Sequence, residues 1–122
     1  MKKIVLTGGK FNKIHPGHIW LLKKAKKLGF LVVVLANDNH NKRSYALSAR
    51  TRKKNLEALK LADKVVIGDP KSFVKVVKKF NPAVIILGYD QQLPKDTVKF
   101  IADEKIKVVR SDKHGDYETK KL

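Results

Sequence analysis

The sequence contains no cysteine, which excludes disulfide bonds and thiolate metal ligands. It also lacks any run of about 18 apolar residues, the length that a membrane-spanning helix needs. Near the N-terminus only Ile4 to Leu6 are apolar before polar residues return, so we expect no signal peptide. These absences are compatible with a cytoplasmic protein that has no membrane association, and this is the location that we expect.

Acidic residues are few. The chain has 11 Asp and Glu against 28 Lys and Arg, which gives a formal net charge of +17. Such a chain attracts polyanions at low salt, so nucleotides, phosphorylated metabolites, nucleic acid and anionic membrane surfaces are candidate targets. Runs of lysine usually mark solvated helix faces, however, and we expect binding to nucleic acid to be no more than non-specific.

The length of 122 residues and the 43% of hydrophobic residues predict one folded domain, residues 1–122, with one core. Apolar runs alternate with amphipathic segments. We predict strands at Ile4–Leu6, Phe30–Asp38, Lys64–Asp69, Ala83–Asp90 and Ile106–Val109, and helices at His18–Leu28, Ser48–Leu61, Pro70–Phe80 and Pro94–Glu104. Ser48 and Asp69 are the expected N-caps, and Val98, Ile101 and Ala102 are expected on the inner side of the last helix.

Strands that alternate with helices predict an α/β fold, a Rossmann-like, doubly wound domain with a five-stranded parallel sheet. With strand order 3-2-1-4-5 the winding reverses between the first and fourth strands. Ligands of such folds bind beyond the carboxyl ends of the strands at this point. The unusual residues of this chain follow these two strands, in the segments Thr7–His18 and Gly88–Asp90.

The first of these segments reads TGGKFNKIHPGH and has the parts of a phosphate site. Gly8 and Gly9 allow the backbone to approach a ligand. The helix that follows starts near Gly17 and offers N–H groups and a positive dipole end, while His15 and His18 can donate to phosphate oxygens. No P-loop or G-x-G-x-x-G pattern is present. Two alternatives stay open: two histidines that share a metal ion, and a long turn with capping histidines.

The stretch GGKFNKIHPGH resembles the nucleotidyltransferase superfamily that carries a Gly-x-Phe-Asp-x-x-His-x-Gly-His pattern. The segment ARTRKKNLEALKLADKVVIGD is similar to cytidylyltransferase-like members, and IILGYDQ resembles the archaeal FAD synthase branch. Glycerol-3-phosphate cytidylyltransferases and sugar-phosphate adenylyltransferases are the alternatives within this superfamily. The motif positions that match are Gly9, Phe11, His15, Gly17 and His18.

The resemblance implies a reaction in which a phosphorylated acceptor such as FMN attacks the α-phosphate of ATP or CTP, and pyrophosphate leaves. It implies that His15, His18 and Arg52 hold the phosphates, and that Lys42 and Arg43 serve the acceptor or the pyrophosphate. Mg²⁺ would be carried by the nucleoside triphosphate, with no assigned protein ligand. The implied nucleotide-binding residues are Thr7, Gly8, Gly9, Phe11, Gly17, Gly88, Tyr89 and Asp90. Asp90 has an alternative role as a helix cap or turn residue.

The chain departs from the superfamily pattern at three places. Lys10 stands where Thr or Ser is common and adds a positive charge that would assist catalysis beside the triphosphate. Asn12 stands where Asp is usual and lacks its charge. The tail offers only Lys113 and Thr119 as phosphate-binding candidates in place of a Gly-Ile-Ser-Thr-Thr-like stretch.

A non-catalytic nucleotide- or nucleic-acid-binding protein is the alternative of another class, and the +17 charge favours it. Basic residues are not interleaved with aromatic residues, however, as they are in surfaces that stack bases. A nucleotidyltransferase, with FMN as the expected acceptor, is therefore the function that the sequence favours. Dimers are common in the superfamily, so a homodimer is a candidate by analogy only, and the sequence does not fix the oligomeric state.

Overall fold

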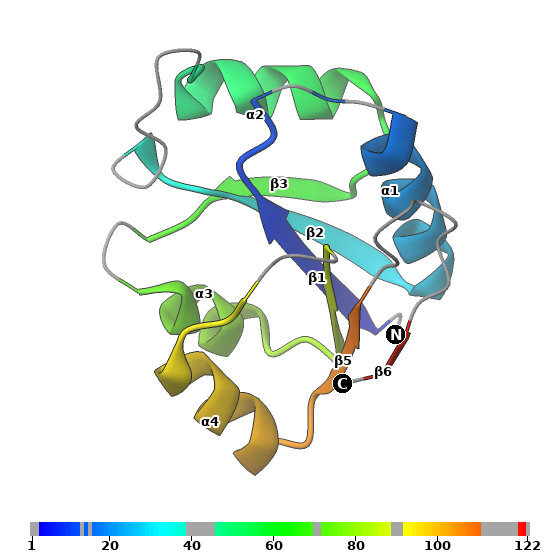
Figure 1. The fold of residues 1–122 in the computed structure, drawn as a ribbon. Helices are drawn as coiled ribbons and strands as arrows, with labels where there is room; N and C mark the ends of the chain where they lie inside the picture. The colour runs from blue at the N-terminus through cyan, green and yellow to red at the C-terminus, as the bar shows by residue number, and fades with distance from the viewer. Residues whose placement is uncertain are drawn as a thin grey trace.

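The computed structural model describes residues 3–12, 14, 16–38, 46–69, 72–88 and 92–110, together with the backbone of residues 120 and 121. Strands and helices alternate along the chain (Figure 1). In chain order the elements are β1 (Ile4–Gly9), α1 (Pro16–Leu28), β2 (Phe30–Leu35), α2 (Ala49–Ala58), β3 (Lys64–Ile67), α3 (Phe73–Phe80), β4 (Val84–Leu87), α4 (Lys95–Asp103), β5 (Lys107–Arg110) and β6 (Lys120–Lys121).

The strands form one sheet in the order β3-β2-β1-β4-β5-β6. The first five strands are parallel, and β1 lies at the centre, where Val5 is paired with Leu31 of β2 and with Val84 of β4. The predicted order and direction of five strands are therefore confirmed. The two-residue strand β6, which pairs antiparallel with β5, was not predicted.

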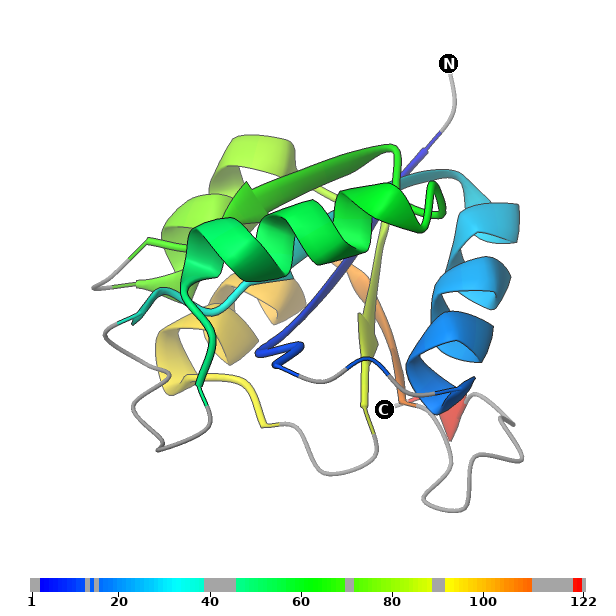
Figure 2. The ribbon, with the colours of Figure 1, turned by 90° about the horizontal axis from the view of Figure 1, so that it is seen from above.

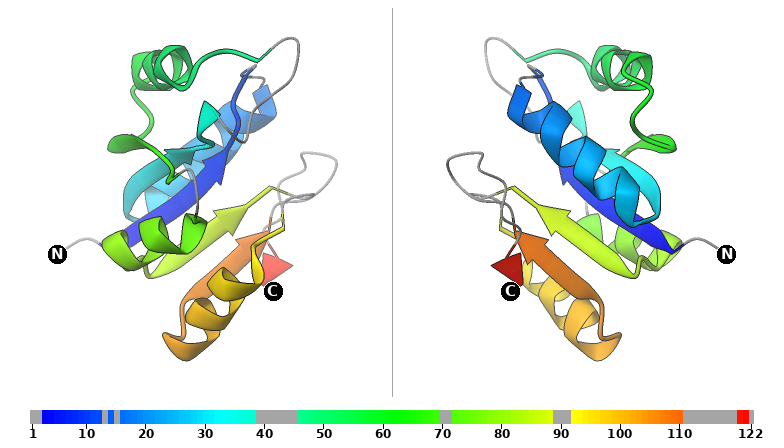
Figure 3. Two further views of the ribbon diagram at one scale, coloured as in Figure 1. Left: turned by 90° about the vertical axis from the view of Figure 1, so that its left-hand side faces the viewer. Right: turned by 90° about the vertical axis from the view of Figure 1, so that its right-hand side faces the viewer.

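Two hydrophobic cores lie on the two faces of the sheet. Successive strand residues alternate between them, as the period of two in a pleated strand requires. The helices α1 and α2 cover one face and α3 and α4 the other (Figures 2 and 3). The change of face comes after β3, so the crevice between β1 and β4 opens at the carboxyl edge of the sheet, as predicted.

Helix starts show where local signals were correct. Ser48 caps α2, since its hydroxyl oxygen accepts from the backbone N–H of Thr51. The prediction that Asp69 caps the third helix was wrong, because α3 begins at Phe73 with Ser72 at the cap position. The Asp69 carboxylate instead accepts from the N–H of Ser72, the residue directly before the helix, at 3.0 Å.

The predicted inner face of α4 was partly wrong. Ile101 is buried as expected, but Val98 is 52% exposed and Ala102 is exposed. Thr97, one turn before Ile101 on the same face of the helix, is fully buried. No helix in the described part of the chain is long and apolar enough to cross a lipid bilayer.

Candidate functional site

A pocket of about 360 Å³ lies beyond the carboxyl ends of the strands, and its size is within the range of small-molecule sites. The ends of β1, β2 and β4, the segment after β3 and the segments before α3 and α4 enclose it. Its lining is mostly apolar, with a few polar groups. The lining residues are Gly8, Gly9, Val34, Leu35, Ala36, Asn37, Gly68, Asp69, Ser72, Phe73, Leu87, Gln92, Leu93 and Pro94.

Gly8 allows the strand ends to approach each other at the base of this pocket. A Cβ atom at this position would lie 3.1 Å from the carbonyl oxygen of Val34 and 3.7 Å from the Phe73 ring. The distance to the Val34 oxygen is shorter than ordinary van der Waals contact, and the added methyl group would also occupy space beside the Phe73 ring. A side chain at Gly8 would therefore press on β2 and narrow the pocket.

His18 lies in the first turn of α1, as its third residue, and is half-buried. Its ring centroid is 5.0 Å from that of Phe11, which is buried and tilted against it. Phe11 has a φ of 52°, in the left-handed region that bulky residues seldom adopt. The turn after β1 thus brings an aromatic ring against the imidazole, which limits the orientations that His18 can take.

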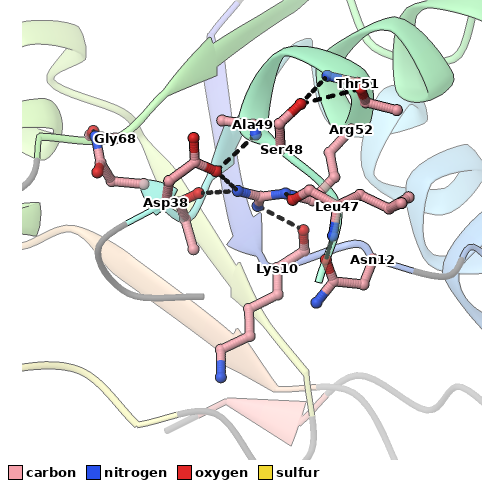
Figure 4. A network of polar contacts seen from close by, with 11 residues as sticks. Lys10, Asn12, Asp38, Leu47, Ser48, Ala49, Thr51, Arg52 and Gly68 are labelled. Carbon is pink, nitrogen blue, oxygen red and sulfur yellow. Dashed lines mark hydrogen bonds and ion pairs between the residues drawn. The ribbon is translucent and has the colours of Figure 1, made fainter. Parts of the chain in front are cut away.

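Arg52, predicted to hold phosphates, is fully buried within α2. Its three guanidinium nitrogens donate to protein oxygens (Figure 4). Nε donates to the carbonyl of Leu47 at 2.9 Å, one Nη to that of Lys10 at 2.8 Å, and the other Nη to that of Ala36 at 2.8 Å and to the carboxylate of Asp38 at 3.2 Å. The structure therefore places Arg52 inside the protein and beneath the strand ends.

Two polar residues around Arg52 were not assigned roles from the sequence. The Asp38 carboxylate also accepts from the N–H of Ala49 at 2.7 Å, so it joins the end of β2 to the start of α2. Asn12, singled out only as a departure from the pattern, accepts from the N–H of Leu47 at 3.0 Å. Asp38 lies three residues after the end of β2, and this polar residue after an apolar run is the signal that could have pointed to the carboxyl edge.

Of the remaining described candidates, some line the pocket and others do not. Gly8 and Gly9 line the pocket, and Lys10 is exposed, with a side chain that extends away from Arg52 (Figure 4). Thr7, predicted to bind nucleotide, is only 1% exposed, and its hydroxyl donates to the carbonyl of Ile86 at 2.8 Å. Its side chain therefore joins β1 to β4 within the sheet and does not face the pocket.

Two glycines complete this group. Gly17 lies in the first turn of α1 beside His18. Gly88 follows β4, and its carbonyl accepts from the Arg110 guanidinium at 3.0 Å, a contact that the sequence gave no reason to expect. The other candidates lie outside the described residues: His15, Lys42, Arg43, Tyr89, Asp90, Lys113 and Thr119.

Asp38 and Asp69, the carboxylates near the strand ends that the structure describes, are already engaged by protein groups. Asp38 contacts Ala49 and Arg52, and Asp69 contacts Ser72, with Lys75 3.9 Å from its other oxygen. Among the described residues no cluster of three or more His, Asp or Glu has the arrangement of a metal site.

Comparisons with known proteins agree with the fold. The family model described as cytidylyltransferase-like matches residues 6–119. FAD synthase of Ferroglobus placidus is 40% identical over 102 residues, which cover 81% of this chain and 66% of that protein. FAD synthase of Aciduliprofundum boonei is 36% identical over 119 residues, which cover 92% of this chain and 80% of that protein.

A solved structure has the same fold. The lipopolysaccharide core biosynthesis protein of Thermoplasma volcanium superposes with a TM-score of 0.77 at 32% identity, over 90% of this chain and 96% of that one. The resemblance seen in the motif is therefore confirmed over almost the whole sequence. The fold, the order of the strands and the family match together show that the chain belongs to the cytidylyltransferase-like family.

Proposed function

We propose that this nucleotidyltransferase transfers the adenylyl group of ATP to FMN, which gives FAD and pyrophosphate. The observation that carries the proposal is the apolar pocket beside Gly8 and Gly9, at the point of the sheet where the family motif begins. The similarity to proteins named FAD synthase supports the same substrates.

The pocket favours an acceptor with a ring system. The Phe73 ring, Leu87, Leu93 and the backbone of Gly8 provide apolar surface, and Asn37 and Gln92 add amide groups near its edge. A flat, largely apolar ring with polar atoms at its rim matches this combination, and the isoalloxazine of FMN has that character. Glycerol 3-phosphate has almost no apolar surface to bury, so the pocket favours FMN over this alternative acceptor.

In the proposed reaction an oxygen of the FMN phosphate attacks the α-phosphorus of ATP. The bond from that phosphorus to the bridging oxygen breaks, and pyrophosphate leaves with the electron pair. Because no group of the protein needs to form a covalent intermediate, the work of the chain is to position two anions and to neutralise their charge. Bound Mg²⁺, carried by the triphosphate, would supply further neutralisation of phosphate charge.

Three parts of the chain fit this task. The N-terminus of α1 presents a positive dipole end. His18, in its first turn, has an imidazole N–H to donate to phosphate oxygens. Lys10 is exposed and cationic and adds charge close to the strand end. We propose that His15, Lys42 and Arg43 assist them, as the family motif suggests.

The test is a pyrophosphate-release screen that combines ATP or CTP with FMN, glycerol 3-phosphate or a sugar phosphate, with chromatography of the products. We expect pyrophosphate release with ATP and FMN and equimolar formation of FAD. The variant His18→Ala, purified in the same way, controls for contaminating host enzyme.

Other outcomes identify the alternatives. Turnover with CTP and glycerol 3-phosphate, or with ATP and a sugar phosphate, would contradict the proposed acceptor but not the reaction class. No pyrophosphate with any pair, together with salt-sensitive binding of random DNA, would support the non-catalytic alternative.

A further inference from the structure

Arg52 is an unusual residue to find at the centre of a domain. Arginine is almost never fully buried unless it is paired, because its charge loses the stabilisation that water provides. Here the guanidinium is 0% exposed, and each of its nitrogens donates to a protein oxygen at 2.8 to 3.2 Å. Within the described part of the chain no buried side-chain nitrogen or oxygen lacks a partner.

The four acceptors belong to three segments of the chain, of which the one at Lys10 lies 42 residues before Arg52. The carbonyl of Lys10 follows β1, the carbonyl of Ala36 and the carboxylate of Asp38 follow β2, and the carbonyl of Leu47 precedes α2. Figure 4 shows these groups around the guanidinium. Arg52 therefore joins the carboxyl ends of the neighbouring strands β1 and β2 to the start of the helix that carries it.

The hydrogen bond from Arg52 to the Lys10 carbonyl links Arg52 to His18, the proposed catalytic residue, through neighbouring residues. Lys10 immediately precedes Phe11, whose left-handed backbone persists only where the surroundings hold it. The Phe11 ring in turn packs on the imidazole of His18. A continuous series of contacts thus runs from Arg52 through Lys10 and Phe11 to His18.

We propose that Arg52 is a positioning residue that fixes the turn after β1 and, through Phe11, the orientation of His18. The inference rests on the proposed function to the extent that His18 acts on the triphosphate. A direct phosphate contact by Arg52 would require the guanidinium to leave the carbonyl oxygens of Lys10, Ala36 and Leu47, which would lose a charged donor. The loss of these hydrogen bonds disfavours such a movement.

The first test needs no substrate. The unliganded protein is treated with phenylglyoxal, which modifies exposed arginines, and the peptides are analysed by mass spectrometry. Arg50, exposed two residues earlier on the same helix, is the internal control. We expect Arg50 to be modified and Arg52 to remain unmodified. Modification of Arg52 at the rate of Arg50 would overturn the proposal.

The second test compares Arg52→Lys with Leu56→Ala, a change at a residue that is 1% exposed one turn later on the same helix. Lysine keeps the charge but lacks the planar fork that reaches three carbonyls. The readouts are the imidazole NMR signals of His18, assigned with His18→Asn, and the steady-state kinetics.

We expect Arg52→Lys to shift the His18 signals and to lower kcat about 100-fold, the scale of a misplacement of roughly 1 Å. We expect the KM for ATP to change less than the kcat, and Leu56→Ala to leave the His18 signals in place. Unchanged His18 signals with a raised KM and a normal kcat would identify Arg52 as a phosphate ligand and overturn the proposal. If Arg52→Lys does not fold, the phenylglyoxal result on the unaltered protein decides.

Discussion

Replacement of His18 by alanine tests the catalytic part of the proposal. The imidazole lies in the first turn of α1, beside the positive end of the helix dipole. The negative charge on the leaving pyrophosphate grows during the reaction, so a donor at this position contributes more in the transition state than in the bound ground state. We expect His18→Ala to lower kcat roughly 100- to 1000-fold, the scale of one lost oxyanion donor. The affinity for ATP should fall far less.

The structure also gives the expected effect on stability. His18→Ala removes the ring contact with Phe11 at 5.0 Å, and an aromatic pair contributes about 0.5–1.5 kcal/mol. Alanine has the better helix propensity, by up to about 0.7 kcal/mol, which offsets part of this loss. The net change should stay within about 1 kcal/mol, so the Tm of the unliganded protein should fall by no more than about 4 °C.

Single-turnover kinetics with radiolabelled ATP, together with equilibrium binding of ATP and thermal unfolding, separate these effects. His18→Asn is the matched control, because it keeps an N–H donor at a similar distance from the backbone and should retain more activity than alanine. Turnover of His18→Ala within a few-fold of the unaltered protein would refute a catalytic role. A Tm loss well beyond the expected range would instead favour a histidine that caps or packs the helix.

Three further substitutions test other parts of the site. Thr7→Val removes a buried hydroxyl that donates to the carbonyl of Ile86, so thermal unfolding should show that the free energy of unfolding falls by about 1 kcal/mol. A several-fold rise in the KM for ATP would contradict this structural role of Thr7. Gly8→Ala places a methyl group against β2 and in the pocket, so the KM for FMN should rise more than the KM for ATP. Equal rises in the two KM values would show that the FMN ring binds elsewhere. Asn12→Asp keeps the acceptor for the N–H of Leu47 and should leave the Tm unchanged, whereas Asn12→Ala removes the acceptor and should lower the Tm. A lower Tm for Asn12→Asp than for Asn12→Ala would show that this hydrogen bond does not stabilise the protein.

The fold was predictable because its signals are local. The apolar runs that became β2 and β4 are short and rich in β-branched residues, and Ser48 stands directly before the helix that it caps. Errors arose where two local signals competed. Asp69 before Pro70 has the pattern of a helix start, but Ser72 holds the cap position, and the Asp69 carboxylate accepts from its N–H.

The site was less predictable, because its contacts join distant parts of the chain. The motif located the pocket, since Gly8 and Gly9 line it. Nothing around Arg52 in the sequence indicates that the carbonyl of Lys10, 42 residues earlier, accepts from its guanidinium. The resemblance implied an arginine that holds phosphates, and only the fold shows that carbonyls surround the guanidinium of Arg52. The strand β6 had no signal either, because two lysines in a charged tail lack the apolar alternation of a strand.

The sheet has consequences for association between molecules. An open strand edge presents unpaired N–H and C=O groups to which another chain can add. Here β6 pairs with Val109 and Arg110 of β5, so one side of the sheet ends in only two residues. The opposite side ends in β3, four residues long, with exposed Lys64 at its start. Short edges that carry lysine disfavour strand addition, so the folded protein should resist edge-to-edge aggregation at high concentration. Loss of residues 120 and 121 would expose β5 and weaken that protection.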